Sequence, residues 1–403
     1  MPMRLVALGA WLRHLATLVA MLFTTTIAVA AAPAQPPLSP TALADHLSRL
    51  ARLTRTVLDS YIDKNGPRDP RYWEHGSFIA TDALSCWACY DTAATAAAVL
   101  SREDTGNVRM RNIAVQTINR VIQTYQEPNG EFAGGGVTSG FVAAEIGVSY
   151  LELRPYLDDE TQATWVDSMR RAADYLISSG DTAFYINGNV NLRQTEVMWL
   201  AWAATGERRF WPAYEHEWQF TIAPPSPRWA DCGLRVTVTP ARADASDGAG
   251  YLTESGGGVP GYDPSYTMVQ LDTATELYVL TRDPRYLRLM NLLFNQERSR
   301  IAGNYVLNAT GGTRKDDMIP FMSAAPAVLV LSGDRRDLAG FWLGQLGVIH
   351  VQYNAATRGT IPDFYKGTSI WLSLPVLAIE WPHGIRAAPC VPRRSVICAR
   401  LFS

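Results

Sequence analysis

DGAGYLTESGGGVPGYDPSYTMVQLDTATELYVLT, residues 247–281, consists of two halves that differ in composition. Its first half is rich in glycine, which frees the backbone, so we expect a loop there and no packed helix or strand. From Tyr266 onward the apolar residues follow a helical spacing. Asp263 or Ser265 can cap that helix, and Pro264 suits its first turn. The stretch therefore predicts a loop that delivers its side chains to the start of a helix.

Outward from this stretch, apolar residues recur at three- and four-residue steps, which predicts one helix after another. Residues 235–239 alternate instead, and predict one short strand or an extended loop. Short turns such as 205–210 and 281–286 join paired helices repeatedly. This pattern favours an all-α fold, an (α/α)n toroid with long loops on one face. The helices are expected at 41–61, 83–100, 108–125, 141–153, 161–178, 187–204, 210–220, 284–295, 319–331, 338–352 and 369–379.

The first thirty residues have the features of a secretory signal peptide. Arg4 and Arg13 precede an apolar run that ends in small residues at Ala28 and Ala30. The alternative is a retained anchor. We expect a secreted or periplasmic protein with four parts: a signal peptide at 1–30, a Pro-rich linker at 31–40, a single toroid domain at 41–385 and a C-terminal tail at 386–403.

The charge balance and the cysteines exclude several classes of protein. The chain has 36 basic and 38 acidic residues, so it carries no basic field for nucleic acid. No apolar segment after the signal peptide is long enough to span a bilayer, so no membrane association is expected after cleavage. Five cysteines without a second CxxC or a histidine pair do not form a zinc site. We therefore expect neither a metal nor a cofactor.

Four glycine-rich loops with aromatic and polar residues each open an apolar helix. They are residues 72–82, 185–193, 254–266 and 308–317. Binding residues concentrate on loops that a rigid scaffold holds, so we expect these loops to converge on one cleft. The third loop would bring Glu254 to it.

Amides and cations in these loops suit a sugar carboxylate. Asn187, Asn189 and Asn191 lie close together, and the last two point the same way if the segment is extended. One of the three can instead cap the following helix. Arg314 and Lys315 follow two glycines and could clamp a carboxylate, or could be a solvated surface pair.

Other loop residues are further candidates for the site. Asp316 and Asp317 could form the acid/base pair of a glycoside hydrolase, although acids at a helix start are already explained by the helix dipole. Trp73 could stack on a sugar ring, and His75 lies in the first loop. His216, on a predicted helix, could reach the cleft from there.

The order of these residues resembles a family. Toroid-type polysaccharide lyases carry an asparagine loop, a tyrosine loop and then an arginine, and this chain offers Asn189 or Asn191, then Tyr262 or Tyr266, then Arg314. The tract around GYDPSYTMVQL looks like the tyrosine loop of alginate and glucuronan lyases, and the chain resembles polysaccharide lyase family 38.

The resemblance implies β-elimination on a uronic-acid polysaccharide or oligosaccharide. A tyrosine would be base and acid, and the amides or the arginine would neutralise the uronate carboxylate. A free tyrosine has a pKa of about 10, so it needs a nearby cation, for which Arg314 is the candidate. We favour Tyr266 over Tyr262 because it lies where the loop becomes helix. One departure is the absence of any histidine between His216 and His350.

Two other functions remain open. A toroid glycoside hydrolase would use acids among Glu254, Asp263, Asp316 and Asp317. A non-catalytic carbohydrate-binding protein would bind a polymer and release no product, because fold alone does not determine function.

Overall fold

The computed structural model describes residues 108–223, 232–256, 259–314, 318–333, 335–346, 374–378 and 381–385, with 39, 41, 42, 45, 98 and 101. The chain divides into two compact units, residues 1–34 and 35–403, and all described residues belong to the second. The predicted signal peptide, most of the first two predicted helices and the C-terminal tail lie outside the described residues.

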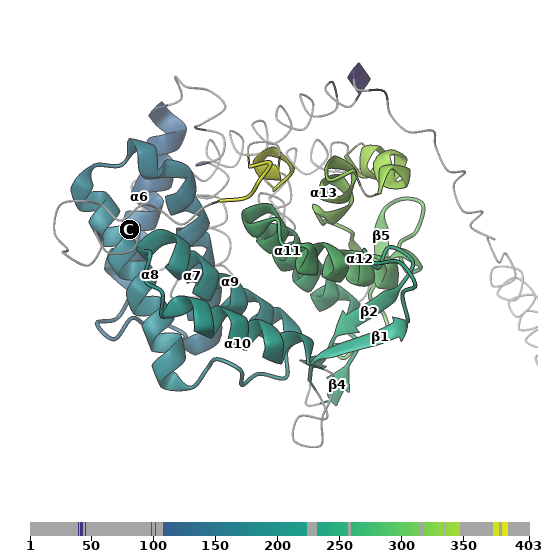
Figure 1. The fold of residues 1–403 in the computed structure, drawn as a ribbon, viewed down its shortest axis with the longest axis horizontal. Coiled ribbons are helices and arrows are strands. Elements are labelled where there is room, and N and C mark those ends of the chain that lie inside the picture. Colours follow the sequence, from purple (N-terminus) through teal and green to yellow (C-terminus); the bar gives the residue numbers. More distant parts are fainter. Residues whose placement is uncertain are drawn as a thin grey trace, which may run out of the picture. The chain divides into compact units, whose positions relative to one another are not determined.

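Helices make up most of the described part, as the sequence predicts (Figure 1). None of them is both long and apolar enough to cross a membrane. The helices are α6 (Val108–Tyr125), α7 (Gly135–Leu153), α8 (Asp159–Ser179), α9 (Gly188–Thr205), α10 (Phe210–Ile222), α11 (Pro264–Thr281), α12 (Pro284–Arg298) and α13 (Ala325–Leu331), with short 3-10 turns η1 (Arg154–Tyr156) and η2 (Arg336–Leu338).

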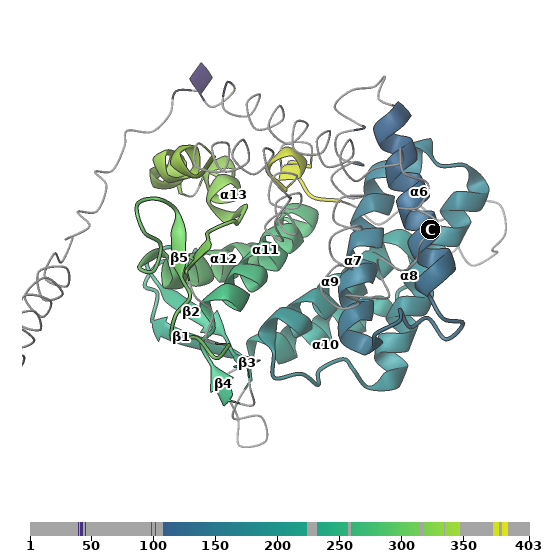
Figure 2. The same cartoon turned by 180° about the vertical axis from the view of Figure 1, so that it is seen from behind.

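The helices form an inner and an outer row. Helices α7 and α9 are buried over almost their whole length, at 16 of 19 and 16 of 18 residues, whereas α8 buries only 6 of 21. Helix α7 packs on α9, and α9 on α11, although a further helix separates each pair in sequence. Helices α8, α10 and α12 cover this inner row from outside, each against the inner helix before it (Figures 1 and 2). This alternation of inner and outer helices is the arrangement of an (α/α)n toroid, and the predicted all-α class is confirmed.

Local signals set the ends of these helices. Asp263 is the N-cap of α11, and its side chain accepts a hydrogen bond from the Tyr266 backbone N–H at 3.1 Å. Pro264 occupies the first turn, as predicted. Gly206 ends α9 with a φ of 70°, a left-handed conformation that favours glycine. The predicted span of residues 108–125 matches α6 at both ends.

The glycine-rich half of residues 247–281 is not a loop, and that prediction was wrong. It contains β2 (Ala249–Leu252), β3 (Glu254–Gly256) and β4 (Val259–Gly261). β2 pairs antiparallel with β1 (Leu234–Val238), which confirms the predicted short strand, and β3 pairs with β4. A Cβ on Gly250 would lie 2.7 Å from the Arg235 carbonyl oxygen, so glycine serves here to let two strands approach closely.

Two helix boundaries also differ from the prediction. Residues 319–331 were expected to form one helix, but β6 (Met318–Pro320) pairs with β5 (Val306–Asn308) and α13 begins only at Ala325. Pairing with a distant strand overrides the local pattern there. Residues 131–140 were expected to be a loop, yet α7 begins at Gly135, directly after the left-handed Gly134 with a φ of 117°.

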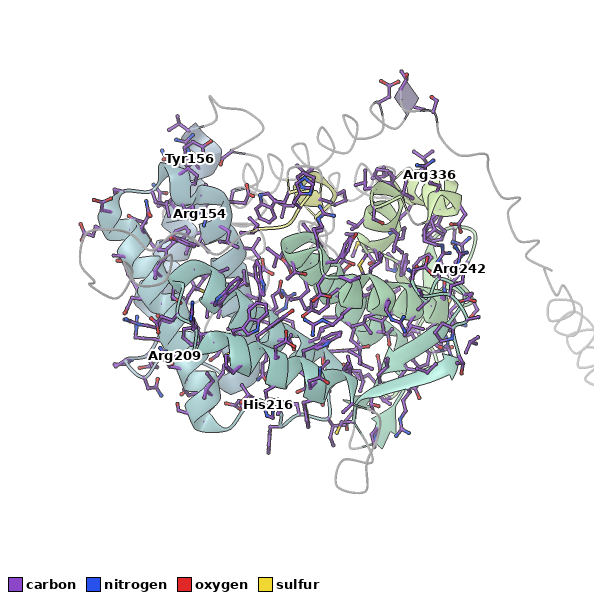
Figure 3. The ribbon with its side chains drawn as sticks, viewed as in Figure 1. Arg154, Tyr156, Arg209, His216, Arg242 and Arg336 are labelled. Atoms are coloured by element: carbon purple, nitrogen blue, oxygen red, sulfur yellow. The ribbon has the colours of Figure 1, made fainter. Side chains whose placement is uncertain are left out.

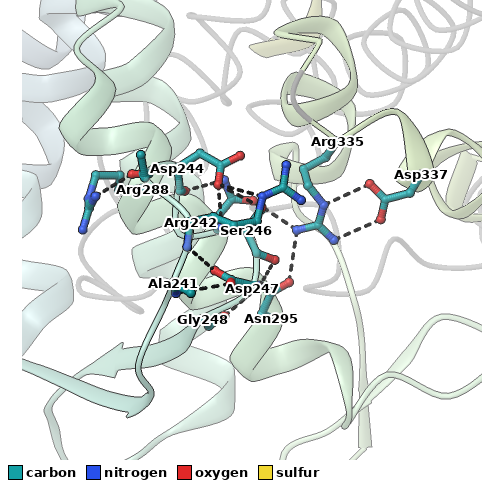
Figure 4. Close-up of polar contacts among 12 residues, drawn as sticks. Ala241, Arg242, Asp244, Ser246, Asp247, Gly248, Arg288, Asn295, Arg335 and Asp337 are labelled. Carbon is teal, nitrogen blue, oxygen red and sulfur yellow. Dashed lines mark hydrogen bonds and ion pairs between the residues drawn. The ribbon is translucent and has the colours of Figure 1, made fainter.

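A polar cluster fixes the loop that leads into β2 (Figure 4). Within the loop, the Asp247 carboxylate accepts hydrogen bonds from the backbone N–H groups of Ala241 and Arg242. From α12, Asn295 donates to the carbonyls of Ser246 and Gly248 at 2.9 and 2.7 Å. The β1–β2 hairpin is therefore held against α12, and the chain enters β3 from a fixed position.

Candidate active site

A buried carboxylate, that of Glu254 in β3, joins the predicted site loops. It is 0% exposed and accepts hydrogen bonds from the Asn187 side-chain amide at 2.9 Å and the Asn189 backbone N–H at 2.8 Å. Gln270 Nε2 donates at 2.8 Å, and Arg314 Nη1 lies 3.3 Å from Glu254 Oε2. Burial raises the pKa of Glu254, and these donors oppose the shift. Glu254 thus ties β3 to the starts of α9 and α11.

Arg314 lies across the phenol ring of Tyr266. Its guanidinium carbon is 3.2 Å from the ring centroid, and its side chain is 24% exposed. Such a contact places the cation on the negative face of the ring. Two chain segments that the sequence separates by about fifty residues therefore meet at the first turn of α11, and the cation keeps partial access to solvent.

Asp263 holds these two segments together. One carboxylate oxygen accepts from the Ser265 hydroxyl at 2.7 Å and from the Tyr266 N–H. The other accepts from the Thr313 hydroxyl at 2.9 Å and the Arg314 backbone N–H at 2.8 Å. Burial works against the charge, but these hydrogen bonds outweigh it and lower the pKa of Asp263. Asp263 is therefore a charged structural acceptor with its oxygens already bonded.

The two candidate tyrosines differ in their surroundings. The Tyr262 hydroxyl donates to Glu297 Oε1 at 2.6 Å, and its ring packs on Tyr251 with centroids 5.0 Å apart. Burial, reinforced by Glu297, raises the pKa of Tyr262, and burial raises that of Glu297 to about 8. Tyr266 is half-buried, and its hydroxyl makes no hydrogen bond to any described residue. Its phenol is thus the more available of the two.

The asparagines do not lie as the sequence suggested. Residues 188–205 are helical, close to the predicted helix at 187–204, so the extended segment in which Asn189 and Asn191 would point the same way does not form. Both are buried, at 4% and 1% exposure. Asn191 Nδ2 donates to the Tyr185 carbonyl at 2.8 Å. Asn187 stands at the N-cap position but makes no capping bond, because its amide binds Glu254 instead.

The described structure does not bring the remaining predicted site residues to the Glu254 carboxylate. His216 is exposed on the outer helix α10 (Figure 3). Its entry into the cleft stays a prediction. Trp73, His75, Lys315, Asp316, Asp317 and His350 lie outside the described residues.

Sequence reasoning missed a buried ionic cluster on the inner helices. Arg193 Nη1 of α9 lies 2.6 Å from Glu196 Oε2 and 2.8 Å from Glu276 Oε2 of α11, with Glu145 of α7 at 3.8 Å. Burial raises the pKa of Glu196 well above its ordinary range, Arg193 opposes this shift, and the neighbouring carboxylates of Glu276 and Glu145 reinforce it. The signal was available in the sequence, because Arg193 and Glu196 are i,i+3 neighbours and the only charged residues of α9.

A half-buried acid, Asp272, lies on α11, between Tyr266 and Glu276 in sequence. Its carboxylate accepts from the Ala324 backbone N–H at 3.2 Å. Burial raises the pKa of Asp272 to about 7. Among the described residues, no group of histidine, cysteine, aspartate and glutamate side chains is arranged to hold a metal ion.

Comparison with known proteins gives similarity at the level of fold only. No family model and no curated protein matches the sequence. The structure is similar to an unsaturated glucuronyl hydrolase mutant from Streptococcus agalactiae complexed with dGlcA-GalNAc6S, with a TM-score of 0.48 and 13% identity over 85% of this chain and 93% of that one. A second mutant of that hydrolase gives 0.48 and 11%, with the same coverage. At these values the similarity carries no assignment of activity.

Proposed function

We propose that the chain is a polysaccharide lyase that cleaves a uronic-acid polysaccharide, of the alginate or glucuronan type, by β-elimination. We also propose that it acts after export, in the periplasm or outside the cell, as residues 1–30 suggest. One observation carries the proposal: the Arg314 guanidinium lies over the Tyr266 ring, 3.2 Å from its centroid, beside the buried Glu254.

The chemistry of the reaction requires such a pair. The proton on C5 of a uronate is weakly acidic, and its removal places negative charge on the adjacent carboxylate. Arginine has five N–H donors, and the bond to Glu254 engages one of the two Nη groups of Arg314. The remaining donors can therefore bind the carboxylate of the substrate and stabilise the charge that develops there.

Tyr266 would move the proton. Its phenolate takes the C5 proton, the C4–C5 double bond forms, and the C4–oxygen bond breaks. The phenol then returns the proton to the leaving glycosidic oxygen, so the base is regenerated and no water is consumed. Tyr262 is less suited to this role, because its hydroxyl donates a hydrogen bond to Glu297 and burial raises the pKa of Tyr262.

The test is ultraviolet absorbance of the unsaturated product, with purified protein against alginate, glucuronan, hyaluronan and pectate. We expect a rise on one polymer that Tyr266→Phe abolishes and Tyr262→Phe retains. A rise that survives Tyr266→Phe but is lost in Tyr262→Phe would move the base to Tyr262. No absorbance change on any of the four polymers would refute the lyase.

A glycoside hydrolase is the second candidate, and one observation favours it. Burial raises the pKa of Asp272 to about 7, and a hydrogen bond from the Ala324 N–H holds its carboxylate in place, which suits a general acid near neutrality. Asp263 and Glu254, the acids expected from the sequence, are less suited because hydrogen bonds already occupy their oxygens. New reducing ends without ultraviolet absorbance, lost in Asp272→Asn, would establish this alternative.

A further inference from the structure

Phe184 is a large apolar side chain held out in solvent. It lies in the loop between α8 and α9 and is 57% exposed, more than any other large hydrophobic residue among those the structure describes. A single exposed apolar residue is common on protein surfaces. Phe184 differs because both of its chain neighbours are anchored to buried groups, so its exposure is imposed by the fold.

The residue before it is pinned in an unusual conformation. Ala183 has a φ of 53°, in the left-handed region that non-glycine residues rarely adopt. Its backbone N–H donates at 2.6 Å to Oε2 of Glu217, a fully buried carboxyl on α10. This contact holds the backbone in the turn that directs the next side chain outward, and such strain concentrates at functional sites.

The residue after it is anchored twice. The Tyr185 hydroxyl donates to Asp181 Oδ1 at 2.6 Å, and its carbonyl accepts from Asn191 Nδ2 at 2.8 Å. The Phe184 ring stands almost perpendicular to the Tyr185 ring, with an interplanar angle of 84° and centroids 5.3 Å apart. This edge-to-face contact fixes the orientation of the exposed ring and leaves a face free.

The loop lies at the end of the inner row where the candidate site is. It leads into the start of α9, and Asn187, which binds Glu254, follows Phe184 by three residues, a span of at most about 10 Å. The loop also contacts the start of α7, since a Cβ on Gly136 would collide with the Asp181 carboxylate. Phe184 therefore lies on the same loop that brings Asn187 to the Glu254 carboxylate.

We propose that Phe184 is a stacking platform for a sugar ring of the polysaccharide, at a subsite next to the reacting bond. The apolar C–H face of a pyranose packs on an aromatic face, and a rigid ring loses little conformational entropy when it binds. The polymer as substrate class rests on the proposed function; the platform itself requires only that a carbohydrate binds.

The test compares Phe184→Ala, Phe184→Trp and a control, Tyr156→Ala. Tyr156 is also an exposed aromatic residue, at 40%. It lies in η1, which follows the C-terminal end of α7, whereas the loop of Phe184 lies at the N-terminal end of that helix (Figure 3). Binding is measured by affinity electrophoresis in gels that contain alginate or glucuronan, and activity by KM and kcat. Because Phe184 is exposed, its replacement is not expected to affect folding.

We expect Phe184→Ala to weaken binding and raise KM about tenfold, with kcat within about twofold of the wild type. Phe184→Trp should restore binding, and Tyr156→Ala should leave it unchanged. Three results would overturn the platform. Phe184→Ala would bind as tightly as the wild type, Tyr156→Ala would lose as much binding as Phe184→Ala, or the wild type would bind neither polymer. Weaker binding in Phe184→Ala without any unsaturated product would keep the platform and refute the lyase.

Discussion

Replacing Glu217 by glutamine is expected to remove a large part of the pH dependence of stability. Glu217 is fully buried on α10, and its Oε2 accepts a hydrogen bond from the Ala183 backbone N–H at 2.6 Å. Burial raises its pKa from 4.5 to about 8. Glutamine has the same shape and can accept the same hydrogen bond, so the variant imitates the protonated acid at every pH.

The sign and size follow from the two pKa values. The folded state holds its proton up to about pH 8, whereas the unfolded chain releases it near 4.5. The stability that Glu217 contributes is therefore complete below the unfolded pKa and is lost as the pH rises through the folded pKa. At about 1.4 kcal/mol per pKa unit, the loss is about 5 kcal/mol overall, and most of it falls between pH 5 and pH 8.

Urea unfolding followed by tryptophan fluorescence measures this difference. Wild type and Glu217→Gln are compared at pH 5, 6, 7 and 8 at one ionic strength, so that the other titrating groups act equally on both. We expect the stability advantage of Glu217→Gln over the wild type to grow by about 3 to 4 kcal/mol from pH 5 to pH 8. Glu160→Gln, which changes an exposed glutamate in the first turn of α8, serves as the control and should follow the wild type.

One result would refute the reasoning. If the wild type and Glu217→Gln keep a constant difference from pH 5 to pH 8, within about 0.5 kcal/mol, the buried carboxyl does not carry the proton in the folded state. The Ala183 N–H would then hold a charged carboxylate, and the loop of Phe184 would be fixed by a stronger, charge-assisted bond.

Three further substitutions test other contacts. Gly250→Val adds atoms where a Cβ already lies 2.7 Å from the facing carbonyl, so the melting temperature should fall, while Gly303→Ala, with nothing within 4 Å, should leave it unchanged. Arg193→Met leaves buried glutamates without a cation and should cost about 3–5 kcal/mol in urea unfolding; a cost under about 1 kcal/mol would contradict the ionic cluster. Asp263→Asn should weaken the cap of α11 by about 1 kcal/mol and, by releasing Arg314, lower kcat about tenfold or more; unchanged kcat would argue against its positioning role.

Helices could be predicted because their signals are local. The span of α6 was predicted at both ends, and Asp263 and Pro264 mark the start of α11. The spacing of apolar residues and the capping side chains act within a few residues of each other. The start of α13 was missed because β6 forms only through pairing with β5, and no local pattern contains that partner.

The site was predicted in part. The sequence selected Glu254, Tyr266 and Arg314, and the structure places these three together. The sequence predicted a helix at 187–204 but could not show that Asn189 and Asn191 are buried there, because their burial depends on how α9 packs between α7 and α11. The sequence also could not show that His216 is exposed, because its exposure follows from the position of α10 in the outer row.

The sequence by itself determined the all-α class, most helix limits and the residue types that can act on a uronate, since these depend on periodicity, caps and side-chain chemistry. Only the tertiary structure decided that Arg314 lies on Tyr266 and that Arg193 meets Glu276. The physical reason is that a helical hydrogen bond joins residues four apart, whereas these contacts join residues far apart in sequence and exist only after the inner helices have packed.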